Sequence, residues 1–392
     1  MNLIQVKEKG AQSLFQNYGR MDICFTHGEG VYLYDTAGFE YLDLVAGIAV
    51  NAVGHSHPDW VQAVSAQAAR LCHVSNLYHI IEQVELAETL LSVAPPGMER
   101  ALFVNSGAEA NEAALKLAVK HTGKKRIASA LDSFHGRTAV SLGATGQLEY
   151  QAGFETLIPE IFDHFALDDV EGLKAAVGQD TAALMLEPIQ GESGVRSAST
   201  EFFRTARDLC DDNGALLVID EVQTGIGRTG EWFGITHHGI EADIICLAKG
   251  MGGGFPIGGI MSSAEIASAF VPGTHGTTFG GNPLACASAS AVLSIIMNEG
   301  LVDNAASIGT GIIENLQAID HPEIIEVRGR GLMIGIEMKS LAKAFQAYAL
   351  EHNVLVNVCH GDVVRLVPPL LLAQKEAERF TGLFREFLQQ IP

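Results

Sequence analysis

The chain has 392 residues, with 25 lysine and arginine residues against 46 aspartate and glutamate residues, which gives a formal net charge of −21. Proteins that bind nucleic acid draw their affinity from clustered basic residues, so this balance excludes nucleic acid as an expected partner. Apolar residues make up 47% of the chain and charged residues only 18%, which is typical of a globular protein with a large core.

Glycine is unusually frequent, with 42 residues, or about 11% against about 7% in average proteins. The glycines stand in short groups inside apolar sequence, which indicates backbone that approaches a ligand closely. The 6 cysteines stand far apart with no CxxC pair, so we expect neither a zinc ribbon nor a disulfide framework. The first residues lack the apolar stretch of a signal peptide, and no run of about 18 apolar residues is visible. We therefore expect a cytoplasmic protein that does not enter a membrane.

Short apolar runs alternate with amphipathic helical patterns through the middle of the chain. The runs predict strands buried on both faces, at 101–104, 182–186, 215–219 and 242–247. This alternation predicts an α/β fold with a mostly parallel sheet. The C-terminal third reads differently, with a long helix at about 283–298, a second helix, an alternating segment at 323–338 and a final helix after Gln374. We predict a large domain at 51–282, a smaller α+β domain at 283–392, and an N-terminal segment at 1–50 that packs with the small domain.

A turn of small residues, Asn105 to Asn111, follows the first predicted strand and opens a helix. Such a turn presents free N–H groups and the positive end of the helix dipole, which together bind a phosphate. An ordinary Asn or Ser N-cap explains the same residues, and this motif alone does not separate the two interpretations.

Two carboxylates, Asp220 and Glu221, follow the strand at 215–219. A carboxylate at the C-terminal end of a buried parallel strand lies where α/β sheets place their ligands, and it needs a cationic partner, such as a pyridinium nitrogen. A loop cap is the plain alternative. A magnesium site is not supported, because no Gly-x-x-x-x-Gly-Lys-Ser/Thr loop precedes the pair.

A single lysine, Lys249, follows the strand at 242–247 and is the only lysine between Lys174 and Lys339. Desolvation at such a position would lower the pKa of the lysine and make its amine a nucleophile for aldehydes. Most lysines are solvated surface charges, but isolation on an apolar strand favours a catalytic lysine.

Two further patterns suggest other classes of site. Gly225 to Gly230 match the G-x-G-x-x-G pattern of dinucleotide-binding proteins, so an NAD-dependent dehydrogenase is a remote alternative. A mostly polar stretch separates the strand from the first glycine, and a poor helix start follows the last one. Histidines form pairs without a third ligand at a plausible spacing, so we expect loop histidines and no metal site. These histidines are His55, His57, His237 and His238.

Together with Ser133–Thr138, Glu187–Glu192 and His275–Pro283, these motifs resemble the class III pyridoxal-phosphate aminotransferases. The resemblance runs from about Gly28 to Pro369. It implies fold type I of pyridoxal-phosphate enzymes, the fold of aspartate aminotransferase, and a homodimer with active sites at the subunit boundary. The implied cofactor is pyridoxal 5'-phosphate.

The resemblance also implies a role for each site residue. Lys249 would bind the cofactor aldehyde covalently and then act as general acid and base, and Asp220 would pair with the pyridinium nitrogen. Further residues would hold the phosphate or the ring. They are Ser106, Gly107, Ala108, Phe134, Val222, Gln223 and, reaching across from the partner subunit, Thr278.

Substrate binding would depend on two arginines, by the same resemblance. Arg137 would bind the carboxylate end of an ω-amino donor, and Arg365 would bind the α-carboxylate of 2-oxoglutarate. Glu192 would act as a gate that masks Arg365 while the donor is bound, and Thr277 belongs to the same predicted substrate site. A guanidinium binds carboxylates in a bidentate manner, although a plain salt bridge is the alternative for either arginine.

The implied reaction moves the 5-amino group of N2-acetyl-L-ornithine to 2-oxoglutarate, giving N-acetyl-L-glutamate 5-semialdehyde and L-glutamate in arginine biosynthesis. Other donors stay open, namely succinylornithine, N-succinyl-LL-diaminopimelate, ornithine and 4-aminobutyrate. A scaffold protein without a cofactor is a further alternative. The sequence departs from the family at Met21 to Ile23, which replace a proline-containing stretch after a Tyr-x-Arg segment at Tyr18 to Arg20.

Overall fold

The computed structural model describes residues 1–391. Its larger sheet is mostly parallel; among these residues, only β10 runs antiparallel to its neighbours β4 and β9. The strands lie in the order β4 (Arg100–Val104), β10 (Gly258–Ser262), β9 (Ile244–Leu247), β8 (Leu216–Asp220), β7 (Thr181–Leu186), β5 (Arg126–Ala130) and β6 (Phe162–Phe165). The predicted α/β fold with a mostly parallel sheet is confirmed.

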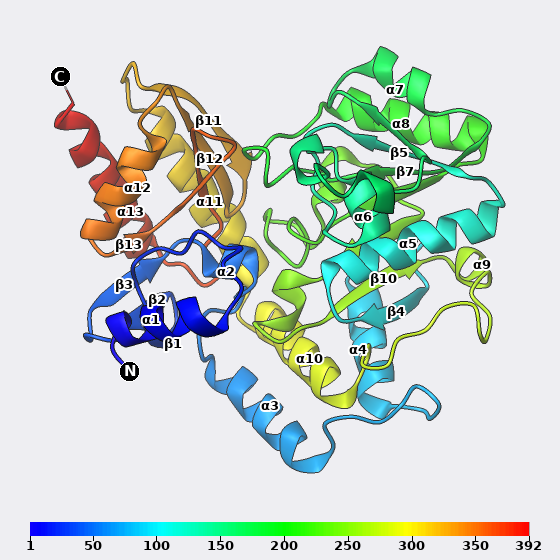
Figure 1. Cartoon of the computed structure of the whole chain (residues 1–392), viewed down its shortest axis with the longest axis horizontal. Coiled ribbons are helices and arrows are strands. Elements are labelled where there is room, and N and C mark those ends of the chain that lie inside the picture. The colour runs from blue at the N-terminus through cyan, green and yellow to red at the C-terminus, as the bar shows by residue number, and fades with distance from the viewer. Residues whose placement is uncertain (392) are drawn as a thin grey trace.

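Helices cover both faces of this sheet, which explains why its strands are apolar without interruption (Figure 1). Leu217 and Ile219 of β8 belong to the core shared with α8 (Thr200–Asn213). Val218, between them, belongs to the core shared with α5 (Gly107–Thr122). Shorter helical segments lie around the sheet: α6 (Ala139–Ala144), α7 (Val170–Ala176), α9 (Ala264–Ala267), η1 (Leu148–Tyr150), η2 (Glu155–Leu157) and η3 (Gly234–His238).

The long helix predicted at about 283–298 is α10 (Pro283–Asn298). It begins at a side-chain cap, where Asn282 Oδ1 accepts the Ala285 N–H at 2.9 Å. It packs against α3 (Pro58–Arg70), α4 (Ile81–Ser92) and α11 (Leu301–Gln317). Within residues 1–391 no single helix is long and apolar enough to cross a membrane, and the pair α10 and α11, which would be long enough together, is bent by 64°.

Two smaller sheets lie in the N-terminal segment and the C-terminal third, and one of them joins these two parts of the chain (Figure 1). One holds β1 (Phe25–Glu29), β2 (Tyr32–Asp35), β3 (Glu40–Asp43) and β13 (Val354–Leu355), and β13 pairs in parallel with β3. The other holds β11 (Ile324–Arg330), β12 (Met333–Met338), β15 (Val363–Leu366) and β14 (Asn357–Cys359). The alternating segment predicted at 323–338 is the hairpin of β11 and β12. The remaining helices are α1 (Leu3–Ser13), α2 (Ala46–Ala49), α12 (Ala342–Glu351) and α13 (Gln374–Gln389).

The glycine-rich segment Gly225–Gly230 lies between β8 and η3 in the chain, and it packs against the C-terminal third instead of opening an α-helix. Gly230 has a φ of 83°, and a Cβ there would lie 2.8 Å from a side chain of α11. Arg228 is buried and donates to the main-chain oxygens of Leu332 and Pro368. Close packing between the two regions therefore accounts for the G-x-G-x-x-G match.

Candidate active site

A cavity of about 460 Å³ opens at the C-terminal ends of the parallel strands, beside the N-terminus of α5. Most of the predicted site residues line it: Ser106, Gly107, Ala108, Phe134, Arg137, Glu192, Asp220, Val222, Gln223 and Lys249. Within the part of the chain that the structure describes, the lining leaves out Thr277, Thr278 and Arg365. The fold thus brings together side chains from five separate loops.

The N-terminus of α5 combines both interpretations of the Asn105–Asn111 motif. Ser106 is the N-cap, and its Oγ accepts the Glu109 N–H at 3.2 Å. The N–H groups of Gly107 and Ala108 have no hydrogen-bond partner within residues 1–391, as at the first turn of any helix. Free N–H groups at the start of a helix are suited to an anion such as a phosphate. A Cβ on Gly107 would lie 2.8 Å from Val222 Cγ1, so glycine is needed for this close approach.

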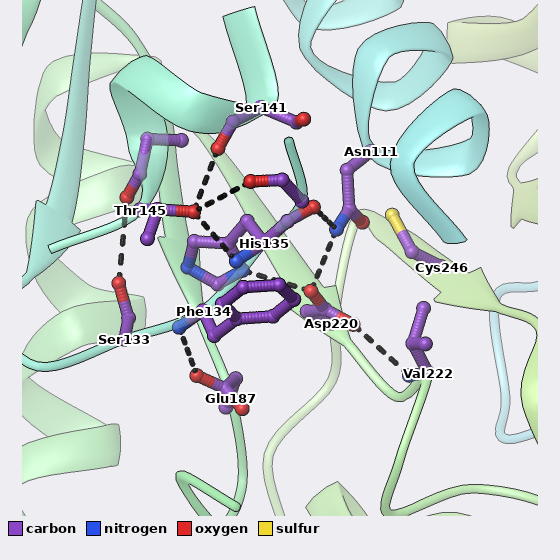
Figure 2. A network of polar contacts seen from close by, with 12 residues as sticks. Asn111, Ser133, Phe134, His135, Ser141, Thr145, Glu187, Asp220, Val222 and Cys246 are labelled. Atoms are coloured by element: carbon purple, nitrogen blue, oxygen red, sulfur yellow. Dashed lines mark hydrogen bonds and ion pairs between the residues drawn. The ribbon is translucent and has the colours of Figure 1, made fainter. Parts of the chain in front are cut away.

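Asp220 ends β8 on the cavity side, buried and held by three donors (Figure 2). Asn111 Nδ2 and His135 Nδ1 donate to Oδ2 at 2.7 and 2.8 Å, and the Val222 N–H donates to Oδ1 at 3.0 Å. Burial alone would lower the pKa of His135, but the hydrogen bond to Asp220 raises it above the ordinary value. The carboxylate is therefore fixed in place and available to a cationic group in the cavity.

Sequence interpretation assigned no role to His135 or Asn111. Both stand inside the motifs described above, but their contacts to Asp220 span 85 and 109 positions. Asn111 reaches Asp220 from α5, and His135 reaches it from the chain between β5 and α6. His135 Nε2 and Asn111 Oδ1 are buried and lack a hydrogen-bond partner among residues 1–391. The only sequence signal for these two residues was their position: His135 directly follows Phe134, and Asn111 lies in the first turns of α5.

Lys249 follows β9 and begins η4 (Lys249–Gly252). Its φ of 39° lies in the left-handed region that residues other than glycine rarely adopt, so the fold holds this residue in a strained conformation. Burial lowers the pKa of its amine below the ordinary lysine value, although the carboxylates of Glu192 and Asp220 act in the opposite direction. A lysine with a lowered pKa is a better nucleophile at neutral pH.

Two further buried carboxyl groups, those of Glu187 and Glu221, differ in their position and contacts. Glu187 lines the cavity and accepts the N–H groups of Phe134 at 2.9 Å and Gly191 at 3.4 Å. Burial raises its pKa to about 7. Glu221 instead accepts the N–H groups of Gly234 and Ile235, at the start of η3, and burial raises its pKa to about 7. Of the predicted pair, Glu221 is thus the loop cap and Asp220 is the residue of the cavity.

Arg365 lies on β15 behind the cavity and is 1% exposed. Its Nη1 donates to Glu192 Oε1 at 2.7 Å, to Gly191 O at 3.0 Å and to Gln223 Oε1 at 3.2 Å. Burial alone would raise the pKa of Glu192, but Arg365 lowers it below the ordinary value. Glu192 lines the cavity while Arg365 does not, so this carboxylate covers the guanidinium on the cavity side.

Arg137 lies on another side of the cavity and is exposed. Its guanidinium carbon stands 3.8 Å from the ring centroid of Tyr150 and 5.5 Å from that of Phe134. It also lines a neighbouring cavity of about 750 Å³, together with Tyr18 of the N-terminal segment. An aromatic contact of this kind orients the guanidinium without neutralising its charge.

The segment before α10 carries the other predicted site residues. Thr277 Oγ1 accepts a hydrogen bond from Asn105 Nδ2 at 3.1 Å, which ties this segment to the start of α5. Thr278 is exposed. Asn76 Nδ2 donates to Gly280 O at 2.9 Å, so the chain before α4 is tied to the same segment.

The residues around the cavity fit a small aromatic aldehyde that carries a phosphate and a basic ring nitrogen. The free N–H groups at Gly107 and Ala108 suit the phosphate, and Asp220 suits a protonated ring nitrogen. The Lys249 amine suits the aldehyde. Pyridoxal phosphate has these three groups, and the cavity volume suits a ligand of its size.

Comparison with known proteins supports the same conclusion. The family model for class-III aminotransferases matches residues 14–388. The acetylornithine aminotransferase of Methanothermobacter thermautotrophicus is 44% identical over 380 residues, covering 96% of this chain and 97% of that one. The ornithine aminotransferase of Toxoplasma gondii has a TM-score of 0.94 at 30% identity, over 100% and 96% of the two chains. The acetylornithine aminotransferase of Elizabethkingia anophelis has a TM-score of 0.88 at 29% identity, over 100% of both chains. The chain therefore belongs to the class-III aminotransferases, a family of pyridoxal-phosphate-dependent enzymes.

Proposed function

We propose that this enzyme moves the 5-amino group of N2-acetyl-L-ornithine to 2-oxoglutarate, giving N-acetyl-L-glutamate 5-semialdehyde and L-glutamate, and so serves arginine biosynthesis. The observation that carries the proposal is a pair of arginines at one cavity, Arg137 open and Arg365 covered by the Glu192 carboxylate. Two guanidinium groups in different states suit two carboxylate substrates that bind in turn. The name of the Methanothermobacter relative supports N2-acetyl-L-ornithine as the donor.

The cofactor would be held by residues of the cavity. Gly107 and Ala108 would donate their free N–H groups to its phosphate, with Ser106 as the cap. Phe134 and Val222 would contact the ring, and Gln223 would reach the ring hydroxyl. When bound, pyridoxal phosphate supplies an electron sink that stabilises negative charge on the carbon next to the transferred nitrogen.

The side chains of the enzyme would then move protons and orient the substrates. Lys249 Nζ would bind the cofactor covalently in the resting enzyme and, once displaced by the donor amine, take a proton from the carbon that bore this amine. Asp220, fixed by His135 and Asn111, would keep the ring nitrogen protonated. The same groups would act in reverse when 2-oxoglutarate takes up the nitrogen.

Arg137 would select the donor by binding its carboxylate end, which leaves the distal amine for the cofactor. Arg365 would bind 2-oxoglutarate after Glu192 moves away. While Glu192 stays in place, a carboxylate of the donor finds no second free arginine in the cavity, so the donor binds in one direction.

Half-reactions measured one at a time would test the donor assignment. The purified enzyme is mixed with N2-acetyl-L-ornithine, ornithine or 4-aminobutyrate, and the change in cofactor absorbance is followed by stopped flow. We expect the highest kcat/KM for N2-acetyl-L-ornithine, and no reaction with any donor in Lys249→Ala. Equal or higher values for ornithine, the substrate that the name of the Toxoplasma protein gives, would overturn the assignment.

We further propose a homodimer, supported by exposed apolar side chains close to the cavity. Leu77 is 85% exposed and Phe279 is 60% exposed, and Tyr78 and Ile81 are also exposed. Hydrogen bonds tie the segments that carry them to each other. A second copy that covered this patch would also meet Thr278, which is exposed and adjoins Phe279. Light scattering at micromolar concentration should give twice the chain mass, and Leu77→Asp should reduce it to the monomer mass.

Two further proposals concern organisation and location. We propose that residues 1–50 and 283–392 form one small domain beside a large domain at 51–282, supported by the pairing of β13 with β3. We also propose that the enzyme works in the cytoplasm, supported by the absence of an apolar signal stretch in its first residues. Limited proteolysis with mass spectrometry would test the domain boundaries, and cell fractionation would test the location.

A further inference from the structure

The guanidinium of Arg365 has five N–H donors, and the structure gives each of its nitrogens an acceptor. The edge formed by Nη1 and Nη2 faces Glu192, whose carboxylate oxygens lie 2.7 and 3.5 Å from these two atoms. The remaining hydrogen of Nη1 has Gly191 O and Gln223 Oε1 as acceptors. The other edge, formed by Nε and Nη2, faces Asn357.

Asn357 is a residue of β14 that pairs directly with Arg365 of β15. Its Oδ1 accepts from Arg365 Nη2 at 2.7 Å and from Nε at 3.1 Å, so one neutral oxygen occupies the whole second edge of the guanidinium. An arginine has only donors, which fixes the amide oxygen of Asn357 as the atom that faces it. Because a guanidinium is planar, fixing one edge fixes the direction of the other.

We propose that Asn357 is a positioning residue for the acceptor substrate. It holds the guanidinium so that its Nη1–Nη2 edge meets the cavity, where the carboxylate of a dicarboxylic keto acid can replace that of Glu192. This inference rests on the proposed role of Arg365. Three of the five donors stay occupied by Asn357, Gly191 and Gln223 during the exchange, and the two that Glu192 leaves form one bidentate site.

The neutral amide is important for this role. A carboxylate at position 357 would give Arg365 a second anionic partner that never leaves, and the incoming substrate would meet a neutralised guanidinium. Without an acceptor at position 357, Nε and Nη2 would lose their hydrogen bonds in a buried site, and the guanidinium would turn toward other acceptors. Substitution of Asn357 should therefore weaken acceptor binding more than donor binding.

The test uses Asn357→Leu, which keeps a similar size and removes the acceptor oxygen. Gln346→Leu is the matched control, because Gln346 Nε2 donates to Val356 O at 3.0 Å and supports the same stretch of chain without contacting Arg365. Arg365→Ala is measured alongside. For each holoenzyme, calorimetry gives the dissociation constant of glutarate, a dicarboxylate that cannot react. Stopped flow gives the KM of each half-reaction, and thermal unfolding gives stability.

We expect Asn357→Leu to raise the glutarate dissociation constant about tenfold, as for one misplaced charge-assisted hydrogen bond. The acceptor KM should rise by the same factor relative to the donor KM, and Gln346→Leu should move neither ratio. If Asn357→Leu binds glutarate as the unaltered enzyme does while Arg365→Ala does not bind it, the inference about Asn357 is wrong and the role of Arg365 stands. If Arg365→Ala still binds glutarate normally, the proposed role of Arg365 itself is wrong. If Asn357→Leu and Gln346→Leu raise the glutarate dissociation constant and the KM ratio equally, Asn357 supports the local structure only and is not a positioning residue.

Discussion

Replacing Glu192 by glutamine removes the charge that covers Arg365 and keeps the shape of the side chain. Stripping one partner from a buried ion pair costs about 3–5 kcal/mol. Here the cost is smaller, because Arg365 keeps Gly191, Gln223 and Asn357 as acceptors and because Glu192 is itself 25% exposed. A glutamine oxygen also remains able to accept. We therefore expect a loss of about 1–1.5 kcal/mol in this contact, the range of an ordinary hydrogen bond.

The same amount should appear as a gain in acceptor binding. Under the proposed role of Arg365, an incoming carboxylate displaces Glu192 from this arginine, so the strength of the ion pair is subtracted from the affinity for 2-oxoglutarate. Weakening the pair by about 1.4 kcal/mol should lower the KM for 2-oxoglutarate about tenfold. The variant should also lose donor selectivity, because Arg365 is then exposed to the carboxylate of any amino acid that enters the cavity.

Stopped-flow half-reactions measure both effects, with 2-oxoglutarate as acceptor and with N2-acetyl-L-ornithine or glutamate as donor. Glu337→Gln is the matched control. It removes a carboxylate of similar exposure, 23%, from another arginine, Arg328, outside the cavity. A Glu192→Gln enzyme with unchanged KM for 2-oxoglutarate and unchanged preference between the donors would refute the reasoning, since the ion pair would then not compete with the substrate.

Three other predictions follow from the geometry of the cavity. Gly107→Ala places a Cβ 2.8 Å from Val222 Cγ1, so overpacking of about 1–3 kcal/mol should weaken cofactor binding. Adding Val222→Ala in the same chain should restore part of the affinity, which a fluorescence titration with the cofactor measures. If the double variant shows no rescue, the steric explanation is wrong. His135→Phe removes a donor from the buried Asp220 and should lower stability by about 1–3 kcal/mol in urea unfolding, whereas unchanged stability would show that water replaces the imidazole. Burial lowers the pKa of the Lys249 amine below 10.5, so the folded chain releases this proton at a lower pH than the unfolded chain does. The free energy of unfolding should therefore rise with pH between the lowered pKa and 10.5. Covalent capture of pyridoxal phosphate by the apoenzyme should accordingly have a pH midpoint below 10.5, and a midpoint at or above that value would exclude a desolvated amine.

The strands and the ends of the strands were predictable because each depends on a few adjacent residues. A continuous apolar run such as 215–219 indicates burial on both faces, and Asp220 at its end marks the ligand side of the sheet. His135, Asn111 and Asn357 could not be found in this way. Each acts through a hydrogen bond to a residue outside its own segment, on β8 or β15, and its partner is defined only when the helices and sheets have packed.

The Gly225–Gly230 segment shows the converse, since it matches the dinucleotide pattern while its glycines serve packing within the protein. In a dinucleotide site the glycines allow a phosphate to approach a helix start. Here Gly230 allows α11 to approach, and Arg228 binds main-chain oxygens of the region that carries Arg365. The lack of a side chain at Gly230 thus allows close contact between two protein segments. The residues next to the motif did not indicate that α11 would be the segment in contact.

The electrostatics of the cavity follow from the pairing of Arg365. A chain with a net charge of −21 repels 2-oxoglutarate at long range, so binding needs local positive charge. Yet carboxyl groups stand near the same cavity, among them Asp220 and Glu192, and Glu192 is paired with Arg365. Exchange of Glu192 for a substrate carboxylate leaves the charge around Arg365 unchanged. Affinity for the acceptor therefore depends on how well the substrate replaces one carboxylate at a fixed guanidinium edge, and much less on the overall potential of the protein.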